Sequence, residues 1–328
     1  MSKSNSKKNV YIHIGHSKTG STAFQNFLTN NHLKLQNLGI YYPVNHHLLN
    51  IASNNDFQIG NLPAFKLLDK DSNSWVDTFI IKRIKNSPSY KSYLFSNEGL
   101  SEKNRAEKFW GQLEKYNNEF NFIFIQCYRN PLDTMTSQYL MDIKKRGLTK
   151  MKFYRHLPLG PNKKFLENCI EKNYQINLYN YSLEKDNLWE SILNSIHDCD
   201  NEIKEILSNY PKTKDNRGLT KAEQYIIKFI NYFGKNNLSD YVSRNFITTF
   251  KNKSAYHPQI SSDNIKFLKN KYDSDLIFVN NHLGEDLALI WEQKPQIKIN
   301  KISEINEFFI MSIFALYLIV KYIFLPNK

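Results

Sequence analysis

Residues 10–22 read VYIHIGHSKTGST, in which a short apolar run ends in a glycine and passes into a loop of small and polar residues. Residues 23–28 follow with the apolar spacing of an amphipathic helix. A buried strand, a glycine-bounded loop and a helix in this order are typical of α/β folds that bind nucleotides. This opening therefore predicts an α/β domain whose first strand leads into a loop at a helix N-terminus.

The rest of the chain continues the alternation of apolar runs and amphipathic stretches. Further strands are predicted at residues 39–43, 93–96, 120–128 and 175–179. Helices are predicted at residues 75–86 and 102–116, and residues 183–283 are mostly helical in pattern. The run FNFIFIQCY at 120–128 is almost continuously apolar, as in a parallel strand covered on both faces. We therefore expect a P-loop-like three-layer α/β domain with a central parallel sheet and a helical C-terminal part.

Composition places the chain among folded proteins and limits its partners. Its 328 residues are 41% hydrophobic, which is enough for a sizeable core. The net charge of +13 is spread along the chain, without a dense basic block interleaved with aromatics, so we expect no nucleic-acid partner. An anionic nucleotide ligand or an anionic membrane accounts better for this excess of cations.

The predicted compartment is the cytosol. Residues 1–9 are polar and basic and lead directly into the first strand, so we interpret them as a disordered tail and not as a signal peptide. Cys127, Cys169 and Cys199 are too few and too far apart for a disulfide framework or a zinc site. We expect all three thiols to be reduced.

The loop after the first strand has the chemistry of an anion site. A glycine-bounded turn at a helix N-terminus presents backbone N–H groups and the positive end of the helix dipole to a phosphate. Lys18 adds a positive charge, and the neighbouring Ser and Thr hydroxyls add donors. The loop is not a Walker A loop, in which lysine follows the last glycine, because Lys18 precedes Gly20.

The run Lys18-Thr19-Gly20-Ser21-Thr22 resembles the 5′-phosphosulfate loop of sulfotransferases that use 3′-phosphoadenylyl sulfate (PAPS). Later segments, among them Ser96-Asn97-Glu98, are similar to the bacterial branch of that family that acts on carbohydrates. The resemblance implies PAPS as donor, PAP as product and no required metal. It assigns the 5′ end of the donor to Ser17, Lys18, Thr19, Gly20, Ser21 and Thr22.

A second site follows from the same resemblance. The family holds the 3′-phosphate of the donor with an arginine at the end of a later strand and a serine about eight residues further on. Here Arg129 closes the run FNFIFIQCY, Asn130-Pro131 is a helix start, and Ser137 falls eight residues after Arg129. The resemblance therefore assigns the 3′-phosphate to Arg129 and Ser137, and a guanidinium suits a phosphate because it can bind it with two parallel N–H groups.

The reaction requires a base for the acceptor hydroxyl and a cation for the departing phosphate oxygen. Lys18 is the expected cation. Glu98 is the preferred base because it follows a predicted strand, at the edge of the sheet where ligands bind. Its alternative role is to cap the next helix. His16, within the loop, is the second candidate base.

The predicted function is transfer of a sulfuryl group from PAPS to an acceptor hydroxyl, with a glycan or glycolipid as the favoured acceptor. Two alternatives remain open from the sequence. One is a P-loop nucleotide kinase or NTPase, which would need a Gly-Lys-Ser/Thr ending and an Asp for Mg²⁺ where this chain has Arg129. The other is a membrane-tethered protein that binds nucleotide or glycan without catalysis.

The C-terminal part differs from the rest. Residues 308–325, FFIMSIFALYLIVKYIFL, contain only Ser312 and Lys321 that are neither apolar nor aromatic. We expect a sulfotransferase domain at 10–295 and an apolar helix at 303–325 that attaches the protein to the cytoplasmic face of the inner membrane. The alternative is a helix that packs against the domain or a second subunit.

Overall fold

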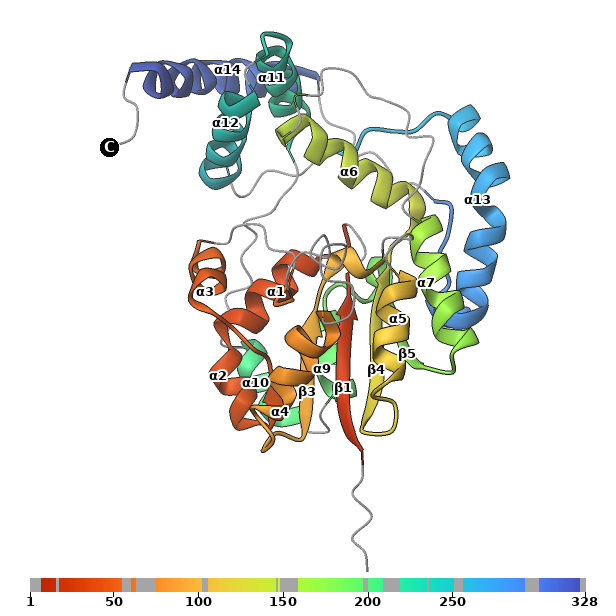
Figure 1. Ribbon diagram of the computed structural model, residues 1–328. Helices are drawn as coiled ribbons and strands as arrows, with labels where there is room; N and C mark the ends of the chain where they lie inside the picture. Colours follow the sequence, from red (N-terminus) through yellow and green to blue (C-terminus); the bar gives the residue numbers. More distant parts are fainter. Residues whose placement is uncertain are drawn as a thin grey trace, which may run out of the picture. The chain divides into compact units, whose positions relative to one another are not determined.

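Five parallel strands form the sheet at the centre of the fold (Figure 1). In the order β2-β3-β1-β4-β5 they are β2 (Ile40–Tyr41), β3 (Ser92–Ser96), β1 (Lys8–Ile14), β4 (Phe120–Tyr128) and β5 (Gln175–Asn180). The computed structural model describes residues 7–15, 18–54, 60–62, 75–101, 106–145, 147, 159–196, 200–208, 219–234, 236–250, 256–292 and 301–324. The predicted α/β fold, with a central parallel sheet and a helical C-terminal part, is confirmed.

Every strand predicted from an apolar run is present. Strand β4 has the predicted bounds, whereas β1 begins at Lys8, two residues earlier than its apolar run. Residues 1–6 of the predicted N-terminal tail lie outside the described residues. Cys127 and Cys169 are buried free thiols, as expected, and Cys199 also lies outside the described residues.

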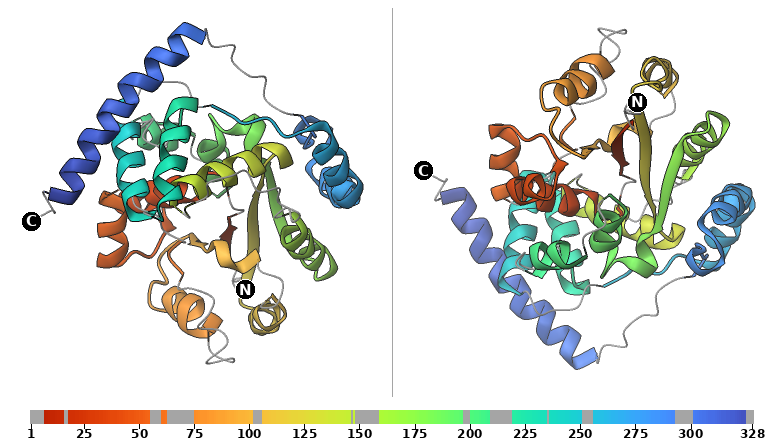
Figure 2. Two further views of the ribbon diagram at one scale, coloured as in Figure 1. Left: turned by 90° about the horizontal axis from the view of Figure 1, so that it is seen from above. Right: turned by 90° about the horizontal axis from the view of Figure 1, so that it is seen from below.

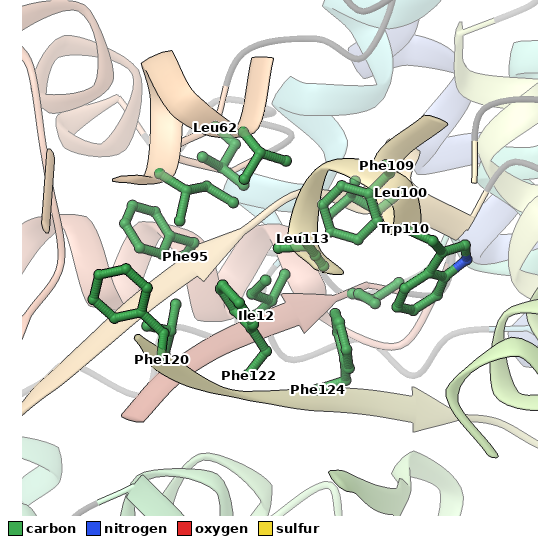
Figure 3. Close-up of a cluster of buried hydrophobic side chains, with 14 of the residues drawn as sticks. Ile12, Leu62, Phe95, Leu100, Phe109, Trp110, Leu113, Phe120, Phe122 and Phe124 are labelled. Carbon is green, nitrogen blue, oxygen red and sulfur yellow. The ribbon is translucent and has the colours of Figure 1, made fainter. Parts of the chain in front are cut away.

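Both faces of the sheet are apolar because successive side chains of a strand point to opposite sides. On β1, Ile12 belongs to the core of one face and Tyr11 to the core of the other. Figure 3 shows the first face, where Ile12, Phe95 and Phe124 lie under helix α5 (Ala106–Glu114). The ring of Trp110 meets Phe124 edge-on, with centroids 5.2 Å apart. This aromatic packing holds α5 against the middle of β4.

Helices cover both faces of the sheet, as the three-layer prediction requires (Figures 1 and 2). The first face is covered by the π-helical turn η2 (Asp77–Ile81), α4 (Lys82–Lys85), α5 and α7 (Leu159–Glu171). The second face is covered by α1 (Ser21–Asn30), α2 (His32–Asn37), α9 (Leu188–Ile196) and α10 (Asp200–Ser208). The predicted helix at 75–86 is thus present, with π-helical turns in its middle.

The connections make the carboxyl end of β1 the natural place for a ligand. After β1 the chain passes to α1 on the second face, whereas after β3 it passes to α5 on the first. Strand β4 lies on the other side of β1, and the next helix to cover the sheet, α7, is again on the first face. Ligands of open α/β sheets bind at such a switch point, outside the carboxyl ends of the strands.

The chain folds into two compact units. Unit 1 comprises Met1–Asn130, Leu157–Pro211 and Asn270–Ile290 and contains the sheet; unit 2 comprises Pro131–His156, Lys212–Lys269 and Trp291–Lys328. Besides the elements above, unit 1 contains α3 (His46–Ser53), η3 (Glu98–Ser101), α8 (Tyr181–Glu184) and η4 (Glu285–Leu287), while α13 (Ser262–Leu283) belongs to both. Unit 2 contains α6 (Pro131–Lys145), α11 (Lys221–Tyr232), α12 (Asn236–Thr249) and α14 (Lys301–Phe324).

Helix α14 is the predicted apolar C-terminal helix, and one of its faces belongs to the core of unit 2. Met311, Ala315 and Leu318 are buried in the same cluster as side chains of α6, α11 and α12. At its start, the carboxylate of Glu304 lies 2.6 Å from the ammonium of Lys221 on α11. Figure 2 shows α14 running beside α11 and α12. By length and composition alone, Ser303–Ile323 could also cross a membrane.

We predict that Leu318→Ala will lower the free energy of unfolding by about 2–4 kcal/mol, because its side chain is 2% exposed and its loss leaves a cavity. Leu316→Ala is the matched control on the same helix, 63% exposed, and should change it by less than about 0.5 kcal/mol. Urea unfolding of the full chain followed by circular dichroism measures both. Equal small effects would contradict the packing of α14.

Candidate functional site

The loop between β1 and α1 is shaped by two residues with left-handed backbones. Lys18 has φ 70° and Gly20, the N-cap of α1, has φ 75°. A lysine in this conformation is uncommon, and such residues gather at functional sites. Helix α1 begins at Ser21 with no acidic residue in its first turn, so its positive end is not neutralised there. His16 and Ser17 lie outside the described residues, and Thr22 is half-buried in the first turn of α1.

Gly15 allows the loop to lie close to Glu98. A Cβ added to Gly15 would come within 2.5 Å of the Ser21 hydroxyl oxygen and 2.6 Å of Cγ of Glu98. Only a glycine fits between these two side chains. Thr19 and Ser21 are both buried, and their hydroxyl oxygens lie 3.2 Å apart. The end of β1 thus brings the loop hydroxyls and Glu98 together, as the sequence predicted for Glu98 from its place after a strand.

The environment of Glu98 changes its acidity. Burial raises the pKa of its carboxyl group to about 7, and this effect outweighs the positive charge of Lys18 and a hydrogen bond with Ser21, which both lower the pKa. A carboxyl group with a pKa near neutrality can both accept and release a proton at physiological pH. Glu98 therefore has the protonation behaviour that a general base requires.

A buried polar network fixes the end of β3, which carries Glu98. The Ser96 hydroxyl oxygen lies 2.9 Å from Nδ1 of His13 on β1 and 2.9 Å from Nε2 of Gln25 on α1. Burial lowers the pKa of His13 to about 4, so this imidazole is neutral at pH 7. From the other side, the Ser96 N–H donates to the side-chain oxygen of Asn61 at 2.8 Å. These contacts, from β1, from α1 and from the segment at Asn61, hold the main chain before Glu98 in place.

The turn after β3 is capped by a neighbour of Glu98. The Gly99 N–H donates to the side-chain oxygen of Asn97 at 2.7 Å, and the Asn97 N–H donates to the His13 carbonyl at 3.0 Å. Glu98 itself is the first residue of η3 and points its carboxyl group toward Ser21. Within this turn the capping contact is made by Asn97, whereas residues 102–105, before α5, lie outside the described residues.

Arg129 ties the end of β4 to the loop. Its Nη1 donates to the carbonyl oxygen of Lys18 at 2.7 Å. The guanidinium also lies over the ring of Tyr181, 5.2 Å from the centroid, and the same ring would come within 2.9 Å of a Cβ on Gly20. Lys18, Gly20, Arg129 and Tyr181 are thus in one place. Sequence reasoning missed Tyr181, although its position directly after β5 puts it at the same edge of the sheet.

Asn130 and Ser137 follow Arg129 in the chain, and of these two only Ser137 was predicted to bind the 3′-phosphate. Asn130 lies just before α6; its N–H donates to the Ser182 hydroxyl at 3.0 Å, and its side-chain oxygen accepts from the Ile290 N–H at 3.1 Å. Ser137 is half-buried in α6 of unit 2, eight residues after Arg129. Its pairing with Arg129 stays a prediction.

The sequence pattern around His46 and His47 is that of a polar loop, but the structure places both residues in a helix. Both are exposed in the first turn of α3, because the Asn45 side chain caps this helix by accepting the Leu48 N–H at 2.9 Å. An asparagine before an apolar stretch is a helix-start signal that could have revealed it.

Comparison of the chain with models of known protein families and with curated proteins finds no match. The fold and the geometry of this edge of the sheet therefore carry the functional argument.

We predict that Glu98→Gln will stabilise the protein increasingly as the pH rises from about 5 to about 8. The pKa of Glu98 is raised in the folded state, so its contribution to stability is present below its unfolded pKa and is lost as the pH passes about 7. The gain at pH 8 should be on the order of 1–3 kcal/mol.

Urea unfolding of both proteins at the two pH values measures the difference. Glu171→Gln, which removes an exposed carboxylate from unit 1, is the control. A gain that is the same at pH 5 and pH 8 would rule out the buried carboxyl described here.

Proposed function

We propose that this protein is a PAPS-dependent sulfotransferase. One observation carries the proposal: Lys18, Ser21, Glu98 and Arg129 lie together at the carboxyl edge of a parallel sheet. Two cations and a helix N-terminus suit an anionic donor, and a carboxyl group that titrates near neutrality suits the activation of a hydroxyl. The Lys-Thr-Gly-Ser-Thr run adds the resemblance to that family.

The residues of the loop fit the 5′ end of the donor. The N–H groups of the first turn of α1, the Lys18 ammonium and the hydroxyls of Thr19 and Ser21 would hold the phosphate and sulfate oxygens. Arg129 would hold the 3′-phosphate together with Ser137. A guanidinium carries five N–H donors, so its contact with the Lys18 carbonyl is compatible with binding an anion.

The proposed chemistry uses two side chains of the chain. PAPS supplies the activated sulfuryl group. Glu98 takes the proton of the acceptor hydroxyl while the oxygen of that hydroxyl forms a bond to the sulfur of PAPS. Lys18 stabilises the negative charge that remains on the phosphate oxygen when the bond between sulfur and that oxygen breaks. Because the ammonium of Lys18 also lowers the pKa of Glu98, the two groups act within one electrostatic environment.

The acceptor in this proposal is a hydroxyl of a glycan or glycolipid, and the reaction takes place in the cytosol. Analysis of glycans and glycolipids extracted from the source cells, incubated with PAPS and protein, would identify it by mass spectrometry as a product heavier by one SO₃. The kinase or NTPase alternative predicts binding of ATP with Mg²⁺ in preference to PAP, and the non-catalytic alternative predicts PAP binding without any such product.

We predict that Arg129→Ala will weaken PAP binding by roughly 30–100-fold, because a charge-assisted interaction with the 3′-phosphate is worth about 2–3 kcal/mol. Binding of AMP, which lacks the 3′-phosphate, should change much less. Isothermal calorimetry of both nucleotides measures the ratio of their affinities. Arg244→Ala, which removes an exposed arginine from α12, is the control for net charge.

This comparison separates two roles of Arg129. If the guanidinium only supports the loop through the Lys18 carbonyl, PAP and AMP will weaken by the same factor. Unchanged PAP affinity, or PAP binding no tighter than AMP binding in the unaltered protein, would refute the assignment.

We predict that Glu98→Gln and Lys18→Ala will both lower turnover far more than they weaken PAP binding, with a loss of at least ~100-fold for Glu98→Gln. The rate of the unaltered protein should rise with pH through about 7, as Glu98 loses its proton. PAP release from PAPS, measured with the glycan extract at several pH values, tests this. A nearly normal rate for Glu98→Gln would move the role of base to His16.

A further inference from the structure

The outer face of α14 is a continuous apolar surface on unit 2. Opposite the buried Met311, Ala315 and Leu318, exposed apolar side chains extend from one end of the helix to the other. They include Ile305, Phe309, Ile313, Leu316, Val320 and Ile323. The neighbouring helix α11 exposes Phe229 and Tyr232 as well. Single exposed apolar residues are common on soluble proteins, but a row of this length marks an interaction surface.

The net charge of the protein fits an anionic partner for this surface. The chain has 44 Lys and Arg against 31 Asp and Glu, a net charge of +13. A protein of this net charge is attracted to anionic surfaces, membranes among them.

We propose that unit 2 binds the surface of an anionic membrane, with α14 lying in the plane of the interface and its outer face among the lipids. Helix α14 has 24 residues, with one apolar face packed on the protein and the opposite apolar face exposed. Helices of this length are common among those that lie in the membrane interface. The net positive charge of the protein attracts anionic headgroups, and the exposed apolar row of α14 supplies the hydrophobic contact. This inference does not depend on the proposed sulfotransferase activity.

The same observations disfavour the other ways to cover α14. A membrane-spanning helix would have to withdraw Met311, Ala315 and Leu318 from the core and break the ion pair between Glu304 and Lys221. Two copies paired through α14 would bring together two chains of net charge +13, which repel each other. A nucleic acid would be attracted by the charge, but the exposed apolar row of α14 contains no cation to bind its phosphates.

Co-sedimentation of the full chain with vesicles tests the proposal. We expect binding to mixed phosphatidylglycerol–phosphatidylcholine vesicles, weaker binding at high salt, and weak or no binding to phosphatidylcholine alone. Leu316→Glu should lower the affinity for the anionic vesicles at least ~10-fold, because the variant loses the free energy of transferring the leucine side chain from water into the lipid. Leu33→Glu is the matched control, because Leu33 on unit 1 is 64% exposed and Leu316 is 63% exposed. Both variants should fold normally, as checked by circular dichroism. Leu33→Glu should bind the vesicles like the unaltered protein.

Several results would overturn the proposal. These are no binding to the anionic vesicles at low salt, equal loss in the two variants, or no loss in Leu316→Glu. Bound protein that resists an alkaline carbonate wash would show that α14 spans the bilayer, whereas release supports the in-plane arrangement. A dimer in sedimentation velocity that Leu316→Glu abolishes, without vesicle binding, would assign the surface to a second copy. Binding of a random-sequence RNA that displaces the protein from vesicles would assign the basic surface to nucleic acid.

Discussion

The parallel pairing of β1 with both β3 and β4 is the constraint on which the candidate site depends. Parallel strands end at the same edge, so this pairing places Gly15, Glu98 and Arg129 side by side although they are far apart in sequence. Because β1 is the middle strand, it must be apolar on both faces. The helix after β1, α1, covers one face of the sheet, whereas the helix after β3, α5, covers the other. The loop after β1 is therefore left at the edge, where α1 begins.

The site combines opposite charges with burial. Glu98 is desolvated strongly enough that its pKa rises despite the nearby Lys18, and the left-handed backbone of Lys18 is held by the guanidinium of Arg129. A network of neutral side chains, in which His13 is kept uncharged by burial, fixes the strand end without adding charge. This arrangement is pre-organised, since the groups that would meet a donor and an acceptor are positioned by side chains that meet neither.

The two units differ in physical character. Unit 1 contains the sheet with its aromatic core, whereas the elements described in unit 2 are all helices, among them α14 with its exposed apolar face. If unit 2 meets a membrane as proposed, an acceptor with a lipid moiety would be held at the same surface as the protein. The membrane proposal and the glycolipid acceptor would then reinforce each other, although each is tested separately.

The sequence by itself determined the strands, the fold class and the loop, because the apolar runs and the glycine-bounded turn are local patterns that reflect burial and backbone conformation. Glu98 could also be predicted, since a residue directly after a parallel strand must lie at the sheet edge. Only the tertiary structure decided the rest. Three contacts depend on which strands are neighbours: that of Glu98 with Gly15, that of Arg129 with Lys18, and that of Arg129 with the ring of Tyr181. The packing of α14 was likewise hidden, because the sequence alone does not reveal which distant segments fold together.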